Sequence, residues 1–306
     1  RKIGHNCPMS QLSDLPRTKK FLESDAIRAI GVQICVEFAG RSIEAALGES
    51  RPGVAMTNDS LMVWLSSGKP VTAVAIAQLW HRGLLQLDDP IAKFIPEFAA
   101  HRKGIITIRH ALTHTGGFRG VASRYDALPW DQCVAAICEA RIESNWIPGK
   151  QAGYHIASSW YILGEVVQRL SRKKFSQYVR DELFLPLGMT DSWIGMPPQQ
   201  MDAYGDRLGV MMQTDGGPVR PYPPLNSREA TIWPRPASNA RGTMRELARF
   251  YRMLLNEGET LLSPQTVEAI TSPHRVGMLD QTFRLHVDWG LGFICNAPGD
   301  DMQKFG

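Results

Sequence analysis

The chain has 306 residues, of which 43% are hydrophobic and 21% charged, and its formal net charge is +4. This composition is that of a folded globular protein, and it excludes a disordered chain. The densest basic clusters, residues 17–20 and 172–174, are interpreted as solvated faces, so no nucleic-acid partner is expected. No apolar run reaches the roughly 18 residues of a membrane span. The sequence therefore predicts a globular protein without a membrane-spanning segment.

The five cysteines are odd in number and match neither a zinc-ribbon nor a CxxC spacing. The simplest interpretation is free thiols in a reducing compartment. We therefore expect a cytoplasmic protein, although a removed signal peptide would leave no trace in this sequence.

The first third of the chain combines a hairpin with a helix. Residues 1–20 are polar and form a lead-in, and residues 21–30 suit a short helix. Residues 31–40 and 42–47 alternate like strands, with a turn at Ala39-Gly40-Arg41 between them, which predicts a β-hairpin. The apolar period of Val71–Arg82 predicts a helix.

Helices dominate the rest of the chain. Asp88-Asp89-Pro90 resembles the start of a helix, with an Asp cap and a proline in the first turn. Residues 189–240 are irregular and are predicted to form long loops of the kind that shape binding sites. Residues 286–296 suit a strand. Further helices are predicted over residues 106–112, 127–141, 158–170, 174–184, 243–256 and 263–271. Because strands lie near both ends and helices fill the middle, the predicted fold class is α+β.

A serine precedes a lysine by one helical turn at the start of the apolar helix. Ser66 and Lys69 therefore share one face of that helix. A hydroxyl becomes a useful nucleophile when a neighbouring base takes its proton, and a buried lysine can be that base if desolvation lowers its pKa. The pattern favours nucleophilic catalysis, although SxxK alone also occurs by chance as a capping serine beside an exposed lysine.

The surrounding sequence resembles the serine β-lactamase and penicillin-binding-protein superfamily, and most of all its class C β-lactamase and esterase branch. The resemblance rests on an ordered set of segments between about residues 31 and 296. These are SSGKPVTAVAIAQLWHRGLLQLDDPIAKFIPEF from Ser66, ITIRHALTHTGGF from Ile106, Pro148-Gly149-Lys150 with Tyr154, Tyr161-Ile162-Leu163-Gly164, Leu262-Ser263-Pro264, and Trp289-Gly290-Leu291-Gly292-Phe293.

The resemblance implies a role for each of three residues. Ser66 would be the acylated nucleophile, and Lys69 would share its proton network. Tyr154 would be the partner base, either as a phenolate or through Lys69. A tyrosine pKa of about 10 must fall for that role, which a nearby ammonium can achieve.

The resemblance also implies an architecture. It is one β-lactamase-like catalytic domain over residues 1–306, with an antiparallel sheet flanked by helices. Residues 21–84 and 241–306 would form the α/β part, and residues 85–240 a mainly helical and loop region. The family's last strands and C-terminal helix are expected to be missing from this chain. Its third motif, Lys-Thr-Gly or His-x-Gly, lies on a later strand that donates one oxyanion N–H. Lys304-Phe305-Gly306 shares the outline of that motif, and we interpret it as coincidence.

The second motif departs from the family pattern. It is typically Tyr-x-Asn in β-lactamases, and this chain has Tyr154-His155-Ile156. Ile156 cannot supply the amide that binds a lactam or peptide. This argues against efficient β-lactam hydrolysis and favours ester or thioester substrates. His155 is retained as a weak candidate for a polar contact with the substrate.

The sequence therefore predicts an esterase-like serine hydrolase acting on a small acyl substrate. Alternatives are an acyltransferase, a thioesterase or peptidase of the same family, a β-lactamase, or a non-catalytic member without the third motif. His110 and His114 have the spacing of a zinc pair, but Ala111 stands where HExxH has Glu. GxSxG, P-loop and GxGxxG motifs are missing from the sequence. We expect no metal and no cofactor, and the oligomeric state is left open.

Overall fold

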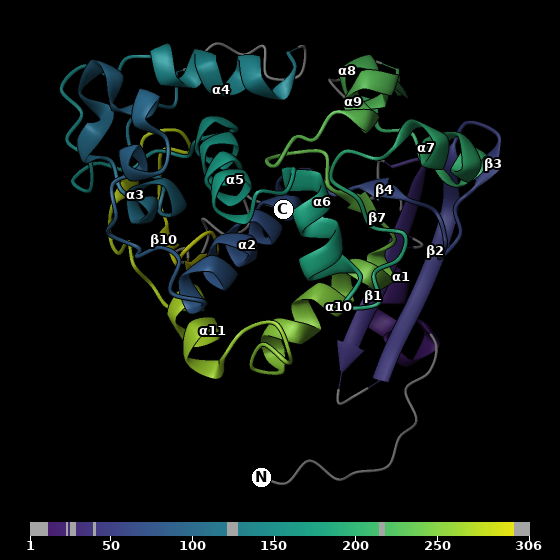
Figure 1. Cartoon of the computed structure of the whole chain (residues 1–306). Helices are drawn as coiled ribbons and strands as arrows, with labels where there is room; N and C mark the ends of the chain where they lie inside the picture. Colours follow the sequence, from purple (N-terminus) through teal and green to yellow (C-terminus); the bar gives the residue numbers. More distant parts are fainter. Residues whose placement is uncertain are drawn as a thin grey trace, which may run out of the picture.

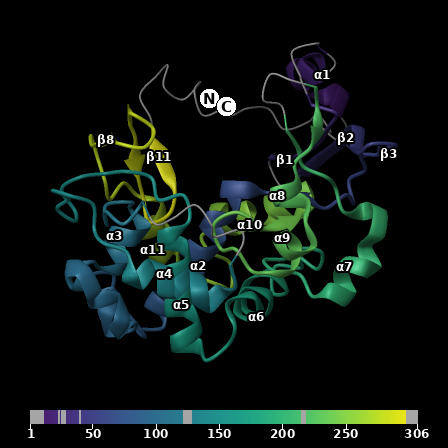
Figure 2. The same cartoon turned by 90° about the horizontal axis from the view of Figure 1, so that it is seen from above.

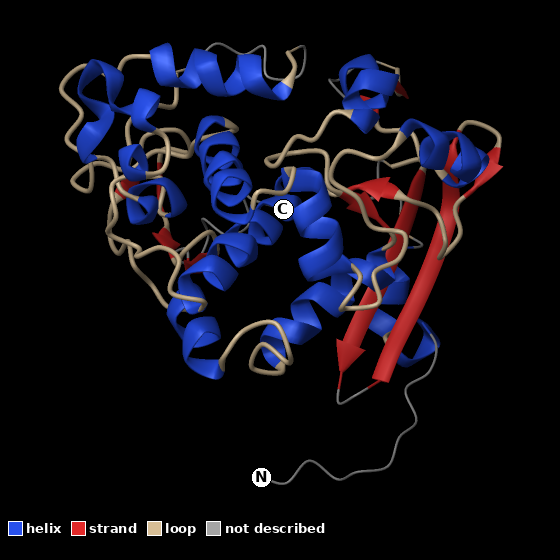
Figure 3. Ribbon diagram, viewed as in Figure 1, coloured by secondary structure: helices blue, strands red, loops and turns tan. Residues whose placement is uncertain are grey.

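The computed structural model describes residues 12–22, 24, 29–38, 41–120, 128–213 and 218–296. Helices and antiparallel strand pairs together make an α+β fold, as predicted (Figure 3). Lys304-Phe305-Gly306, most of the predicted lead-in and the hairpin turn at residues 39–40 lie outside the described residues. No helix within the described ranges is both long and apolar enough to cross a membrane.

The largest sheet is the N-terminal hairpin. Strands β1 (Gly31–Phe38) and β2 (Arg41–Arg51) pair antiparallel, with Gly31 opposite Gly48, and β3 (Val54–Ala55) continues the order β1-β2-β3. Helix α10 (Met244–Leu255) lies along β1, as Figure 1 shows. The helix is amphipathic and buries its apolar face, including Phe250, and thereby covers one side of the sheet.

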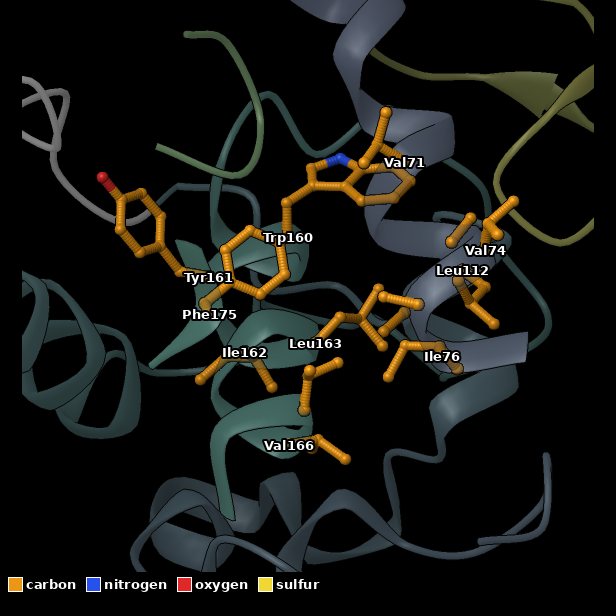
Figure 4. Close-up of a cluster of buried hydrophobic side chains, with 14 of the residues drawn as sticks. Val71, Val74, Ile76, Leu112, Trp160, Tyr161, Ile162, Leu163, Val166 and Phe175 are labelled. Atoms are coloured by element: carbon orange, nitrogen blue, oxygen red, sulfur yellow. The ribbon is translucent and has the colours of Figure 1, made fainter. Parts of the chain in front are cut away.

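Helix α2 (Lys69–His81) lies at the centre of the molecule. Every residue from Lys69 to Leu79 is buried, so this helix has no solvent-facing stripe. A helix that is apolar on all sides belongs in a core. Helix α5 (Ser158–Ser171) packs beside it, and Figure 4 shows Val71 of α2 next to Trp160 of α5 and Val74 next to Leu112, in one buried cluster. The first turn of α2 is therefore held firmly by the core.

The N-terminal hairpin and the last strands of the described chain lie on different sides of the molecule. Figure 2 shows β8 and β11 beside α3 and α11, whereas β1 and β2 lie beyond α10 on the other side. The later strands are β8 (Leu279–Asp280), β9 (Leu285–His286), β10 (Asp288–Trp289) and β11 (Ile294–Asn296), paired β8-β9 and β10-β11. Two more short pairs are β4 (Met62–Val63) with β7 (Arg241–Gly242), and β5 (Met212–Gln213) with β6 (Arg220–Pro221).

The remaining elements are mostly short. The α-helices are α1 (Pro16–Leu22), α3 (Ile108–Leu112), α4 (Trp130–Glu139), α6 (Phe175–Val179), α7 (Pro198–Tyr204), α8 (Pro223–Asn226), α9 (Arg228–Ile232) and α11 (Pro264–Thr271). The tighter 3-10 turns are η1 (Leu12–Asp14), η2 (Leu65–Gly68), η3 (Ile91–Lys93), η4 (Pro96–Ile105) and η6 (Gly205–Arg207). The segment η5 (Arg180–Phe184) is a π-helical turn that continues α6.

Several boundaries differ from the prediction. The helix expected over residues 21–30 overlaps only the end of α1 at residues 21–22, and its residues 23 and 25–28 lie outside the described part of the chain. The helix start expected at Asp88-Asp89-Pro90 is only the 3-10 turn η3, because Pro90 is followed by a single short turn. The strand expected over residues 286–296 is interrupted, since Gly292 has φ +93°, a conformation that L side chains rarely adopt.

Candidate active site

Ser66 lies in a strained turn that ends β4 and precedes α2. Leu65, the residue before it, has φ 49°, which is uncommon for a residue with a side chain and is typical of functional sites. The turn is anchored by Trp64, whose backbone N–H donates to the Ala240 carbonyl at 2.7 Å and whose indole N–H donates to the Gly242 carbonyl. Ser66 itself is exposed, so its hydroxyl is presented at the surface of a rigid support.

The three predicted catalytic side chains meet at one oxygen atom. Lys69 Nζ donates to Ser66 Oγ at 2.9 Å, and Tyr154 Oη donates to the same Oγ at 2.9 Å. Lys69 Nζ also donates to the Ala237 carbonyl at 2.8 Å and lies 5.1 Å from the centre of the Tyr154 ring. A proton on Ser66 therefore has two polar groups within hydrogen-bond reach.

The electrostatics distinguish the two partners of Ser66. Lys69 is 3% exposed, and this burial lowers the pKa of its amine to about 7. The pKa of Tyr154 is raised to about 12, mainly by burial and to a smaller extent by the negative charge of Asp280, and the Ser66 hydrogen bond only partly opposes the rise. A role for Tyr154 as a phenolate base would require a lowered pKa, and the protein shifts this pKa in the opposite direction. Lys69 has the pKa of a base near neutral pH, and Tyr154 is a neutral hydrogen-bond donor.

His155 does not reach the pocket. Its side chain is fully buried, with Nδ1 donating to the Gly153 carbonyl at 2.8 Å and Nε2 accepting from the Phe118 backbone N–H at 3.3 Å. Both ring nitrogens are thus used inside the protein, and the expectation of a substrate contact is corrected. Ile156 is 67% exposed.

His114 is buried and packs against two aromatic residues of the pocket, Tyr154 and Trp289. Its Nδ1 accepts the His155 backbone N–H at 3.0 Å, and its ring centre lies 4.7 Å from that of Tyr154 and 4.6 Å from that of Trp289. His110 Nδ1 instead accepts a backbone N–H in the capping box of α3. The two histidines therefore have separate structural contacts, and the described residues contain no cluster of three or more side chains suited to a metal.

Aromatic side chains surround the reactive group in a pocket of about 520 Å³. Trp289 and Phe293 belong to the WGLGF segment, so the sequence marked their position without revealing their contact with the site. Phe283 and Tyr251 carried no recognisable signal in the sequence. The residues lining the pocket are Ser66, Ser67, Lys69, Pro70, Tyr154, Tyr251, Phe283, Trp289, Gly292, Phe293 and Ile294.

Comparison with known proteins agrees with this fold. Residues 19–306 match the beta-lactamase family. Esterase EstB of Burkholderia gladioli is 31% identical over 294 residues, which cover 85% of this chain and 72% of EstB. Esterase/beta-lactamase LipL of Mycobacterium tuberculosis is 26% identical over 285 residues, which cover 81% of this chain and 64% of LipL. The chain thus spans less than two thirds of the length of LipL.

Solved structures share the architecture. A family VIII carboxylesterase superposes with a TM-score of 0.80 at 23% identity, covering 97% of this chain and 84% of that chain. At that identity the likeness establishes the fold. The chain belongs to the beta-lactamase family, and its relatives include proteins named as esterases.

Proposed function

We propose that this protein is an esterase-like serine hydrolase that works through an acyl-enzyme on Ser66. The observation that supports this most is the contact between Ser66 Oγ and Lys69 Nζ at 2.9 Å, with a lysine pKa of about 7. About half of the lysine is a neutral amine at pH 7, whereas an ordinary lysine is almost entirely protonated. This base has the pKa and the reach that activation of a serine requires.

The chemistry proceeds in two halves. Ser66 Oγ attacks the ester carbonyl while Lys69 takes its proton, and the oxyanion forms beside the backbone N–H of Ser66, near the positive end of α2. The ammonium of Lys69, with Tyr154 as donor, then returns the proton to the departing alcohol. Water attacks the acyl-enzyme and loses a proton to Lys69, and the Lys69 ammonium then gives that proton to the departing Ser66 Oγ, which releases the acid and free Ser66.

The pocket favours an ester over a charged substrate. Its walls are aromatic or aliphatic apart from the reactive residues and Ser67. Apolar walls bind an apolar acyl or alcohol group by removing it from water. The name esterase, borne by both EstB and LipL, agrees with this assignment.

Labelling with a fluorophosphonate tests the nucleophile. We expect the probe on the peptide carrying Ser66, with loss of labelling and of p-nitrophenyl butyrate hydrolysis in Ser66→Ala. Ser67→Ala is the matched control, because Ser67 is exposed in the same pocket and should retain both activities. Folded wild-type protein that stays unlabelled would refute the proposal.

Two further assays test the reaction type. Ser66 is exposed, so water can reach the acyl-enzyme, and we expect acid as the main product even with an added alcohol acceptor. Predominant transfer to the alcohol would identify an acyltransferase instead. Nitrocefin turnover equal to ester turnover would contradict the argument from Ile156.

A further inference from the structure

A buried carboxylate holds the backbone at Tyr154. Asp280 is 0% exposed, and its Oδ1 accepts three backbone N–H groups, from Tyr154 at 3.0 Å, Thr282 at 2.9 Å and Phe283 at 3.1 Å. One oxygen atom thus joins the strand-like segment that carries the tyrosine to the turn that follows β8. Hydrogen bonds to a charged acceptor are stronger than neutral ones, so this junction is stiff.

The second oxygen of the same carboxylate faces a buried arginine. Arg275 Nη1 lies 3.1 Å from Asp280 Oδ2, and the guanidinium also donates to the carbonyls of Thr113 and Val287 at 3.1 Å each. Arg275 is 2% exposed. Stability alone seldom requires a buried ion pair, because apolar residues of similar volume do as well or better. A positional role accounts better for its presence beside a reactive residue.

The segment at residues 280–282 also binds the backbone carbonyl of Tyr154. Thr282 Oγ1 donates to the Tyr154 carbonyl at 3.1 Å, so both backbone polar groups of Tyr154 bind the turn at residues 280–282. Phe283, the next residue, places its ring centre 4.7 Å from that of Tyr154. The tyrosine ring therefore lies between Phe283 and His114 with little freedom to rotate or shift.

We propose that Asp280, fixed by Arg275, is a positioning residue that holds the Tyr154 hydroxyl against Ser66 Oγ. The proposal rests on the proposed function, since it assigns a device that serves the same reaction. Asp280 does not touch the pocket or the reacting atoms. Its effect on rate passes through the Tyr154 backbone, and displacing a catalytic group by about 1 Å can reduce a rate about 10²-fold.

A double-mutant cycle separates positioning from plain stability. Asp280→Ala should lower the rate of Ser66 labelling by fluorophosphonate about 10²-fold per folded molecule. In a Tyr154→Phe background, which has no hydroxyl to position, the same substitution should change the rate by no more than about twofold, the usual scatter of independent effects. A merely structural role would lower the rate equally in both backgrounds and would overturn the proposal.

A milder pair of variants keeps the test decisive if Asp280→Ala fails to fold. Thr282→Val removes the hydroxyl that binds the Tyr154 carbonyl, whereas Thr282→Ser retains it. We expect slower labelling in the valine variant and recovery in the serine variant; equal rates in both would refute the positioning role. Asp202→Ala, which breaks the exposed pair with Arg228, controls for loss of an ion pair and should label at the wild-type rate.

The outcomes also separate this inference from the proposed function. Absence of labelling in the wild-type protein contradicts the serine hydrolase. Labelling that persists at full rate in folded Asp280→Ala contradicts only the positioning role.

Discussion

Replacing Lys69 by arginine tests whether the buried amine is the base. Burial lowers its pKa from 10.5 to about 7, which raises the neutral fraction at pH 7 from about one in 3,000 to about one half. Arginine keeps the positive charge but does not deprotonate in proteins. Loss of a general base slows a reaction about 10²–10⁴-fold, and we expect Lys69→Arg to label Ser66 that much more slowly.

The pH dependence gives the sharper measurement. The labelling rate of the wild-type protein should rise with pH through a midpoint near 7, because only the neutral amine of Lys69 accepts the serine proton. The rates are measured between pH 5.5 and 9 on protein shown to be folded at each pH. A flat profile, or full activity in Lys69→Arg, would refute the assignment.

The same lysine reduces stability. A pKa lower in the folded than in the unfolded state means that the unfolded chain holds the proton between pH 7 and 10.5, so stability rises with pH across that window. At and below pH 7 the penalty is about 5 kcal/mol. Lys69→Met leaves the Ala237 carbonyl without its donor, which costs about 1–3 kcal/mol, so a net gain of about 2–4 kcal/mol is expected at pH 7. Urea unfolding at pH 7 and 10 measures the gain; an equal gain at both would contradict the sign.

Other substitutions address the rest of the site. Tyr154→Phe should slow Ser66 labelling about 10²-fold while the midpoint stays near 7, because the phenol, with a pKa of about 12, is neutral throughout; a shifted midpoint would contradict this. Gly292→Ala should lower the unfolding midpoint in urea, since its φ is +93° and a Cβ there would lie 2.4 Å from Ala73 Cβ; an unchanged midpoint would be inconsistent with this packing. Cys138, whose burial raises the pKa of its thiol to about 11, should resist iodoacetamide at pH 8 until the protein unfolds, as mass spectrometry can show.

The sequence predicts much of this site because its chemistry is local. Ser66 and Lys69 are one turn apart on an apolar helix, so their contact follows from helical geometry. Tyr154 lies 88 positions from Ser66, and only the ordered family resemblance pointed to it. Residue spacing carries no information on burial, so the rise in the pKa of Tyr154 could not be predicted from the sequence.

The parts that the sequence did not predict depend on tertiary contacts. Asp280 ends the two-residue strand β8, which is too short to show a periodicity, and its contacts with three backbone N–H groups form only in the folded chain. His155 looked available because it neighbours Tyr154, but the chain turns its ring inward to the Phe118 backbone. Helices α5 and α10, by contrast, were predictable because their apolar period reflects the face that each buries in the core.

The two buried histidines beneath the reactive tyrosine make the protein vulnerable to acid. Burial lowers the pKa of His155 to about 4 and that of His114 well below its usual value of 6.5. Below pH 6.5 each histidine binds a proton in the unfolded chain but not in the folded state. Each one therefore lowers the free energy of unfolding by about 1.4 kcal/mol for every pH unit of acidification, until its folded-state pKa is reached. If the proposed function holds, we expect mild acid to stop the reaction in two distinct ways. Protonation of Lys69 should be reversed at once when the pH is restored, whereas protonation of the histidine pair should favour unfolding and so require refolding.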